Sequence, residues 1–179
     1  MTPPVQVSTE DARQTSFKLR EAHLTAEHIP LLRSLAVDRC HRWLAERGCV
    51  LGDPEQDPVS AAVHDAMLVL TELLTNVLKH VINHGTCWPP SNVPAQRPGA
   101  PEWIELDLEL EATTGLTLLI VVRDGAPSGP VLDTTEPGDF EGGLGLGLVR
   151  AVSNDDWGWE PTGSGKAVWA RCPLVTPTN

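Results

Sequence analysis

The stretch 63–81, VHDAMLVLTELLTNVLKHV, carries the clearest helical pattern in the chain. Its apolar residues recur every three or four positions, a spacing that places them on one side of an α-helix. Ser60 is positioned to cap the start of this helix, and Gly85 is a natural end. A second helix is predicted from Pro30 to Gly48 on similar spacing. We therefore expect two amphipathic helices in the first half of the chain.

The second half changes to strand patterning. Residues 103–110, WIELDLEL, alternate apolar and polar side chains, as in a half-buried strand. Residues 116–122, LTLLIVV, form a dense run of apolar and β-branched residues, and the turn at 113–115 predicts antiparallel pairing between the two. Two closing strands are expected at 157–159 and 166–171. In the last of these, Lys166 is predicted to be an exposed strand residue.

Helices and strands are thus partly segregated along the chain, which is typical of the α+β class. We expect a two-layer sandwich in which helices cover one face of a mixed, mainly antiparallel sheet. Residues 16–174 are predicted to form one domain, with a short edge strand at 16–22. Residues 1–15 are expected to be a disordered tail, and the five prolines within 83–101 predict an irregular insertion.

Composition narrows the functional classes. The net charge of −11 argues against direct nucleic-acid binding, which relies on Lys and Arg. No apolar run approaches the roughly 20 residues that span a bilayer, and the polar start lacks the apolar segment of a signal peptide. The four cysteines are scattered, without a C-x-x-C pair. We expect a cytoplasmic protein with reduced thiols and no membrane contact.

Three polar residues of the first stretch share one face of the predicted helix. Glu72, Asn76 and His80 are spaced four apart, so their side chains line up beside the core-packing side. A carboxylate can take a proton from an attacking hydroxyl, and a carboxamide oxygen suits Mg²⁺. This stripe predicts a ligand site. His80 with His84 and Cys87 leaves a metal site as a weaker alternative.

Two later features add to this site. Asp124 and Gly125 directly follow a strand, and an ionised carboxylate there can accept the amine of an adenine. An ordinary turn residue is the other reading of Asp124. Gly143, Gly145 and Gly147 allow a backbone to approach a phosphate closely at a helix start, although a flexible loop has the same composition.

Taken in order, these features resemble the nucleotide-binding boxes of the GHKL ATP-binding family, which includes histidine-kinase catalytic domains and gyrase. The chain is most similar to the single-domain anti-sigma-factor serine/threonine kinases of bacteria. ELLTNVLKH at 72–80 resembles their N-box, VRDGAP at 122–127 their first glycine box, and GGLGLGLV at 142–149 their second. GKAVW at 165–169 resembles their closing strand. The resemblance covers roughly residues 16–174 and implies a Bergerat-type ATP-binding fold.

The resemblance also implies roles for individual residues. Asn76 would hold the Mg²⁺ that bridges the ATP phosphates, and Glu72 would be the general base that activates a Ser or Thr hydroxyl of a partner protein. The other implied nucleotide contacts are Lys79 and His80 on the phosphate side, Asp124 and Gly125 at the adenine, and Gly143, Gly145 and Gly147 in a lid spanning 125–147.

The implied function is ATP-dependent phosphorylation, sequestration, or both, of a partner in transcriptional regulation. The partners would be a sigma factor or a STAS-type anti-anti-sigma protein, and the protein would form a homodimer. Two residues differ from the family pattern and leave a second function open. In this alternative the protein is an interaction module that binds ATP weakly or not at all. Ala126 stands where the family usually has glycine, and Ala167 where many members have threonine. Slow ATP hydrolysis with Glu72 activating water is a third reading.

Overall fold

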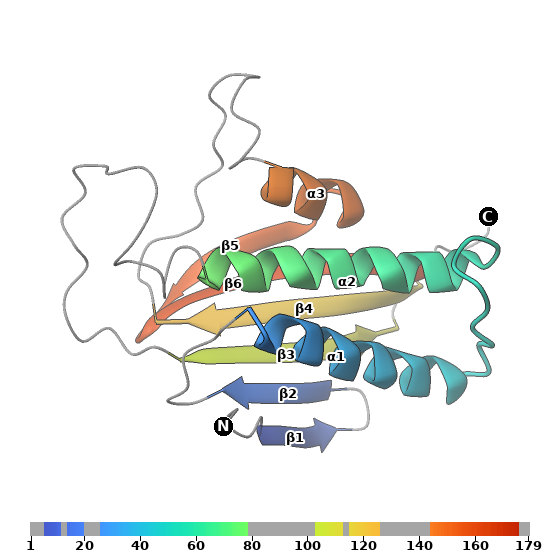
Figure 1. Cartoon of the computed structure of the whole chain (residues 1–179), viewed down its shortest axis with the longest axis horizontal. Coiled ribbons are helices and arrows are strands. Elements are labelled where there is room, and N and C mark those ends of the chain that lie inside the picture. The colour runs from blue at the N-terminus through green and yellow to red at the C-terminus, as the bar shows by residue number, and fades with distance from the viewer. Residues whose placement is uncertain are drawn as a thin grey trace.

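The protein is built from one antiparallel sheet and one layer of helices (Figure 1). The structure is a computed structural model that describes residues 6–11, 14–19, 26–78, 103–112, 115–125 and 144–175. For the first two of these ranges and for Leu144, the description is limited to the backbone.

The sheet has six strands in the order β1-β2-β3-β4-β6-β5. The strands are β1 (Gln6–Asp11), β2 (Gln14–Leu19), β3 (Ile104–Glu111), β4 (Leu116–Asp124), β5 (Trp157–Thr162) and β6 (Gly165–Val175). All the pairings in this described sheet are antiparallel, so the predicted mixed sheet is wrong on this point. A turn at 163–164 joins β5 to β6, and such a short turn returns the chain in the opposite direction.

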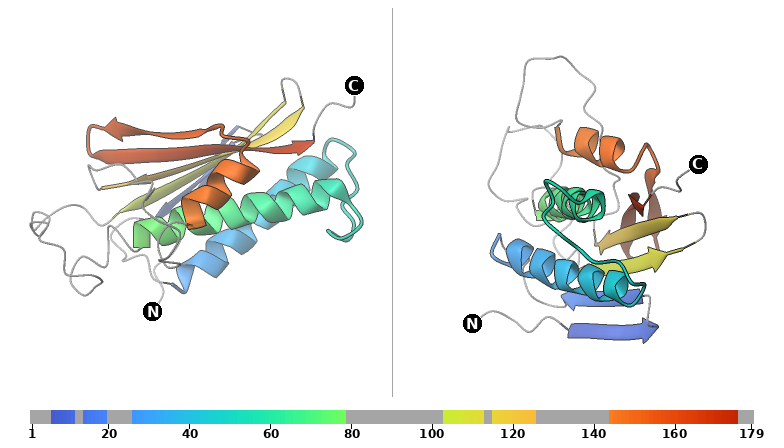
Figure 2. Two further views of the ribbon diagram at one scale, coloured as in Figure 1. Left: turned by 90° about the horizontal axis from the view of Figure 1, so that it is seen from above. Right: turned by 90° about the vertical axis from the view of Figure 1, so that its right-hand side faces the viewer.

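The helices are α1 (His28–Ala45), α2 (Pro58–Val77) and α3 (Leu144–Val152), and all three cover the same face of the sheet (Figure 2). α2 lies between the other two and packs against β4, β6 and both neighbouring helices. The arrangement confirms the predicted α+β class and is compatible with a two-layer sandwich.

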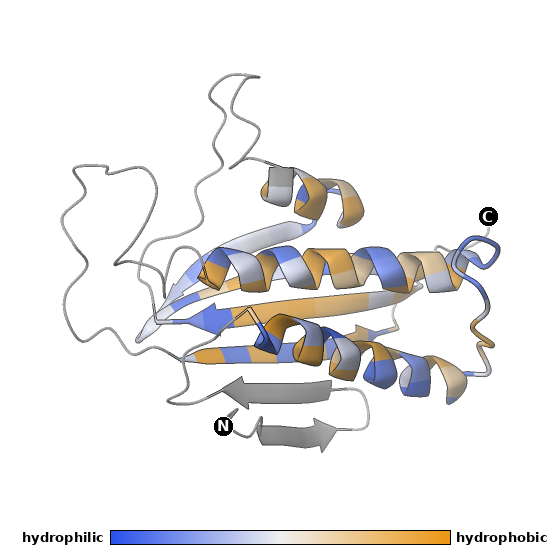
Figure 3. Ribbon diagram, viewed as in Figure 1, coloured by the Kyte–Doolittle hydropathy of each residue, from blue (hydrophilic) through white to orange (hydrophobic). Residues whose placement is uncertain are grey.

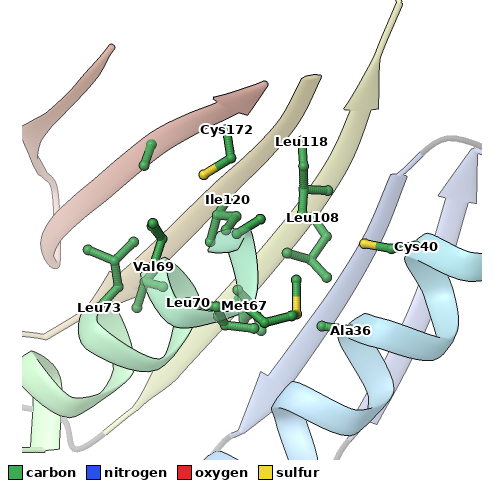
Figure 4. Packing of buried hydrophobic residues seen from close by; sticks show 14 of the residues in the cluster. Ala36, Cys40, Met67, Val69, Leu70, Leu73, Leu108, Leu118, Ile120 and Cys172 are labelled. Carbon is green, nitrogen blue, oxygen red and sulfur yellow. The ribbon is translucent and has the colours of Figure 1, made fainter. Parts of the chain in front are cut away.

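The core lies between α2 and the middle of the sheet. Leu108 pairs with Ile120, which in turn pairs with Ala170, so one row of apolar side chains crosses β3, β4 and β6 toward the helices. Met67 and Leu70 of α2 point into this row (Figure 4). The alternation of β3 and β4 thus places every second side chain in the core, as predicted for half-buried strands.

The start of α2 differs from the prediction, because Asp57 is the cap instead of Ser60. The Asp57 carboxylate accepts hydrogen bonds from the backbone N–H groups of Val59 and Ser60, while Pro58 occupies the first helical position. Pro lacks an N–H that would need a partner there, so Asp57 followed by Pro58 is a favourable start. Ser60 lies in the first turn, and its hydroxyl hydrogen-bonds the same carboxylate.

The N-terminal segment also differs from the prediction. Residues 1–15 were expected to be a disordered tail, but they include β1 and the start of β2. β2 was expected at an edge and instead lies between β1 and β3. β1 and β2 are strands because they pair with each other and with β3, and a polar local sequence gives no signal of such pairing. The predicted insertion at 83–101 lies outside the described residues.

Candidate functional site

Polar groups gather at one end of the helix–sheet layer. β4 ends and β6 begins at this edge because the two strands are antiparallel, with Asp124 paired to Lys166. The C-terminal end of α2 and the start of α3 lie at the same end of the molecule (Figures 1 and 2). Hydropathy changes there too, since β4 turns from apolar to polar at its arrowhead (Figure 3).

Glu72 of α2 lies directly against Gly145 of α3. The three heavy atoms nearest to a Cβ built on Gly145 all belong to the Glu72 side chain, and Oε2 would clash with it. Any larger residue at 145 would therefore displace the carboxylate. The structure thus brings the helix stripe and the glycine-rich segment, 73 residues apart in sequence (145 − 72), into contact.

Asn76 follows Glu72 by four residues, or about 6 Å along the helix axis. Both side chains are partly buried, whereas Leu73, Leu74 and Val77 are buried in the core. The stripe therefore borders the core, as its spacing predicts. Lys79 and His80, the other two predicted contacts on this helix, lie outside the described residues.

The glycines occupy a helix, not only a loop. Gly145 and Gly147 fall within the first turn of α3, and the predicted lid at 125–147 is thus helical from Leu144 onward. Leu146 and Val149 are buried, and their burial stabilises the helix despite its glycines. Gly143 and residues 126–142 of the predicted lid lie outside the described residues.

Asp124 and Lys166 form a buried ion pair. The Lys166 ammonium donates a hydrogen bond to Oδ1 of Asp124 at 2.9 Å. Both residues belong to the core-facing row, because Val122 precedes Asp124 and Val168 follows Lys166 on the same side of the sheet. The prediction that Lys166 is exposed is therefore wrong. The period-two pattern Lys166, Val168, Ala170 was the signal that could have placed it inside.

Close backbone packing holds the carboxyl end of β4 in place. A Cβ on Gly165 would overlap the carbonyl of Asp124 and the Cα of Gly125, so only glycine fits at 165. Gly125 is buried. The predicted base-side residues Asp124 and Gly125 therefore lie in a constrained strand end rather than in an open turn.

Ala167 lies on the opposite face from this pair. It is paired with Arg123, and neighbouring residues of a strand point to opposite faces. Its side chain cannot reach a ligand held between the sheet and α2. The closing-strand residue that faces the same side as Asp124 is therefore Lys166. Ala126, the other departure, lies outside the described residues.

Two of the three described cysteines, Cys40 and Cys172, are core residues rather than reactive groups. Cys40 and Cys172 are buried, and desolvation raises the pKa of each thiol to about 12. Both therefore remain protonated near neutral pH, and a thiol is a poor nucleophile and metal ligand. Cys40, Cys49 and Cys172 are all free of disulfides. His80, His84 and Cys87, the alternative metal site, lie outside the described residues.

The chemistry available at this end is that of oxygen ligands and one base. Glu72 and Asn76 offer carboxylate and carboxamide oxygens, the donor types that a hard cation such as Mg²⁺ accepts. Two such ligands fit an ion that keeps its other positions for water and phosphate oxygens. Within the described ranges, no cluster of three His, Cys, Asp or Glu residues could hold a metal by itself.

The first turn of α3 adds a second kind of contact. Its leading backbone N–H groups have no partners within the helix, and the helix dipole makes this end partly positive. Such an end favours an anion. Because Gly145 lies in this turn and touches Glu72, an anion held there would lie beside the candidate base.

Comparison with known proteins does not identify the chain. No protein-family model matches it, and no curated protein matches it. In addition, no helix in the described part of the chain is both long and apolar enough to cross a membrane. The assignment of function therefore rests on the residues of this site.

Proposed function

We propose that the protein is an ATP-dependent serine/threonine kinase of the GHKL type, with a Bergerat-type fold. The observation that carries this proposal is the contact between Glu72 and Gly145. It unites a base-bearing helix face with a glycine-rich helix start, the two parts that phosphoryl transfer to a hydroxyl needs. The roles of the residues follow from their chemistry.

Glu72 accepts the proton of a partner's Ser or Thr hydroxyl as that oxygen attacks the terminal phosphorus of ATP. The bond from this phosphorus to the β–γ bridging oxygen breaks, and ADP leaves. Asn76 would hold Mg²⁺ through its carboxamide oxygen. When bound, Mg²⁺ neutralises charge on the phosphates and aligns them. The first turn of α3 orients the phosphate oxygens through its backbone N–H groups. Phosphoryl transfer depends mostly on positioning and charge, so these few groups are sufficient.

The resemblance to the anti-sigma-factor kinases suggests transcriptional regulation in the cytoplasm as the biological setting. The proposed partners are a sigma factor, which the protein sequesters, and a STAS-type anti-anti-sigma protein, which it phosphorylates. A homodimer is part of the same proposal. The net charge of −11 supports protein partners over nucleic acid.

One observation favours a second function, an interaction module without ATP turnover. The Asp124 carboxylate, which would accept the adenine amine, already accepts a hydrogen bond from Lys166. If this pair excludes the base, the fold would act through protein contacts alone. Nucleotide binding therefore separates the two functions.

The test is a calorimetric titration of the full chain with ATP, with and without Mg²⁺. The kinase proposal predicts binding that strengthens with Mg²⁺, and Asn76→Ala should remove most of this Mg²⁺ effect. His41→Ala, an exposed change on α1, is the matched control and should leave it intact. Wild-type protein that shows no ATP binding at millimolar concentration would contradict the kinase and favour the interaction module.

A further inference from the structure

The outward face of β4 is apolar where an open sheet face is usually polar. All three helices cover one side of the sheet, and no described element covers the other (Figure 2). β3 has the pattern of such a sheet, with apolar side chains toward the helices and acidic ones away from them. β4 differs, because its outward residues include Leu119 and Val121. A strand that is apolar on both sides is typical of a strand that is covered on both faces.

Trp169 of β6 widens this apolar area. It is paired with Val121, and paired residues of neighbouring strands point to the same face. The side chains of Leu119, Val121 and Trp169 are half-buried. We call these three residues the β4 strip. The strip forms an apolar centre on the face of the sheet that the helices leave open.

Charged side chains border the β4 strip, and they differ on its two sides. On the β6 side, Arg171 donates a hydrogen bond to Glu111 at 3.0 Å, and its guanidinium lies 5.2 Å from the centre of the Trp169 ring. The outward residues on the β3 side are all acidic: Glu105, Asp107, Glu109 and Glu111. The strip therefore lies between an acidic row and an arginine.

These charges determine how two such faces can meet. A twofold axis across the strands would place β3 on β3 of a second copy, so that two acidic rows would repel each other. An axis along β4 instead places β3 opposite β6. Glu109, Leu119 and Arg171 share one row of the sheet, so Glu109 then lies opposite Arg171 of the second copy. The face is thus complementary to itself about an axis along β4.

The residues on this axis meet their own copies. Leu119 would lie against Leu119 of the second copy, and Val121 against Val121, as in the apolar centre of two aligned sheets. Arg123 also lies on the axis, but it brings its own counter-ion because it forms an ion pair with Asp107. The centre of the contact is therefore apolar, and the cation on the axis is already neutralised.

The open face is large enough for a specific dimer. β3, β4, β5 and β6 have 8, 9, 6 and 11 residues. Strands lie about 4.8 Å apart and rise about 3.4 Å per residue, so four strands of about eight residues cover about 500 Å². Two copies together would cover about 1,000 Å², which is the area that a specific interface needs.

We propose that the outward face of the sheet, centred on the β4 strip, binds a second copy of this chain about a twofold axis along β4. The inference rests on the homodimer in the proposed function and names its surface. It does not depend on phosphoryl transfer, because Glu72 and Gly145 lie on the helix side of the sheet. The dimer would leave that side open to a nucleotide and to a protein substrate.

The first measurement is analytical ultracentrifugation of the full wild-type chain. A dimer at about 100 µM is the expected result, because interfaces of this size class dissociate at micromolar or lower concentration. A monomer at that concentration would overturn the inference. The kinase chemistry would be unaffected, since ATP binding is measured separately by calorimetry.

Variants at Leu119 test the axis itself. Leu119→Lys and Leu119→Glu each place a charge where it meets the same charge of the second copy, and each should weaken the dimer at least about 100-fold. An equimolar mixture of the two should dimerise again, because opposite charges then meet. Undiminished dimers of both single variants would overturn the assigned surface, and failure of the mixture to dimerise would overturn the axis.

The matched controls are Leu31→Lys and Leu31→Glu, because Leu31 is 42% exposed on α1, in the helix layer. Neither should change the dimer. If the Leu119 variants do not fold, carboxyl labelling of the wild type with a carbodiimide and an amine decides the question. Labelling of Glu109 should fall as the protein concentration rises, while labelling of Glu46 at the exposed end of α1 stays constant. Equal labelling of Glu109 in dilute and concentrated protein would overturn the inference.

Discussion

At the scale of single residues, Glu72 and Gly145 depend on each other. Glycine inside a helix is unfavourable by about 1 kcal/mol relative to alanine, so a glycine in α3 needs a reason. Gly145 has one, because the Glu72 carboxylate occupies the space that a side chain would need. Gly147, two residues later, has no heavy atom within 4 Å of a built Cβ. A methyl group would therefore meet the Glu72 carboxylate at position 145 and open space at position 147.

Gly147→Ala should raise the melting temperature, because no heavy atom lies near the added methyl group. Gly145→Ala should raise it less, because the carboxylate end of Glu72 must move aside for the methyl group. The gain at Gly147 is about 1 kcal/mol at most, the difference between the two residues in helix propensity. Thermal unfolding followed by circular dichroism measures both. A gain from Gly145→Ala as large as that from Gly147→Ala would mean that the contact between α2 and α3 is not as described.

At the scale of elements, α2 is the helix that carries Glu72 and Asn76. The Asp57 cap at the start of α2 contributes to the stability of the protein in a pH-dependent way. Hydrogen bonds from the Ser60 hydroxyl and the Gly52 backbone N–H, with further backbone N–H groups, lower the pKa of the Asp57 carboxyl from its ordinary 3.8. The unfolded chain then binds a proton at a pH at which the folded one does not. Folding is therefore favoured above the unfolded pKa, and this contribution is lost as pH falls through the folded pKa.

Asp57→Asn should flatten the acid limb of the stability curve. Asparagine is also a good helix cap and does not titrate in this range, but its carboxamide nitrogen cannot accept the hydrogen bonds that Oδ2 of Asp57 takes from Gly52 and Ser60. Stability near pH 7 should therefore fall, because the contribution of the ionised carboxylate is lost there. Urea unfolding at a series of pH values from 7 downward measures the effect. An acid dependence identical to that of the wild type would mean that Asp57 is not among the groups that titrate on unfolding.

At the scale of the whole molecule, one core joins α1, α2 and the sheet, and its cysteines report on its integrity. Cys40 on α1 and Cys172 on β6 are both fully buried, whereas Cys49 is partly exposed. Burial raises the pKa of the two core thiols to about 12, which suppresses the reactive thiolate. Their reactivity should therefore follow global unfolding rather than local motion.

In the native protein at pH 8, iodoacetamide should modify Cys49 well before Cys40 or Cys172. In urea above the unfolding midpoint, all three should react at similar rates. Mass spectrometry of proteolytic fragments locates the modified residues and so keeps them separate from Cys87. Rapid native-state labelling of Cys40 or Cys172 would contradict the described packing of α1 and β6 against α2.

Much of this architecture could be predicted from the sequence, because α2, β3 and β4 have strong periodicity. Their apolar spacing located the ends of β3 and β4 to within two residues and the cap of α2 to within three. It also placed Glu72 and Asn76 on one face. Where two signals competed, prediction was less accurate. Asp57 and Ser60 are both good caps three residues apart, and the geometry around Pro58 favours Asp57.

Lys166 and the α3 glycines show the other limit. Lysine usually lies at the surface, so its residue type led to the prediction of an exposed side chain. The alternation of apolar residues in β6 instead places Lys166 on the buried face. Glycine usually marks loops, so Gly145 and Gly147 favoured the prediction of a loop over the helix that the spacing of Leu146 and Val149 indicates. In both cases the deciding factor is a tertiary partner: Asp124 for the lysine and Glu72 for Gly145. Such partners are distant in sequence, and local patterns do not reveal them.

The most direct test of the central claim is transfer of the labelled γ-phosphate of ATP to a co-purified partner protein, compared between wild type and Glu72→Gln. Loss of a general base lowers the rate of transfer by about 10²–10⁴-fold. We predict a decrease of at least about 100-fold for Glu72→Gln, with ATP affinity changed by less than about threefold. Transfer by Glu72→Gln at the wild-type rate, or ATP-bound wild-type protein that transfers no phosphate, would contradict the account.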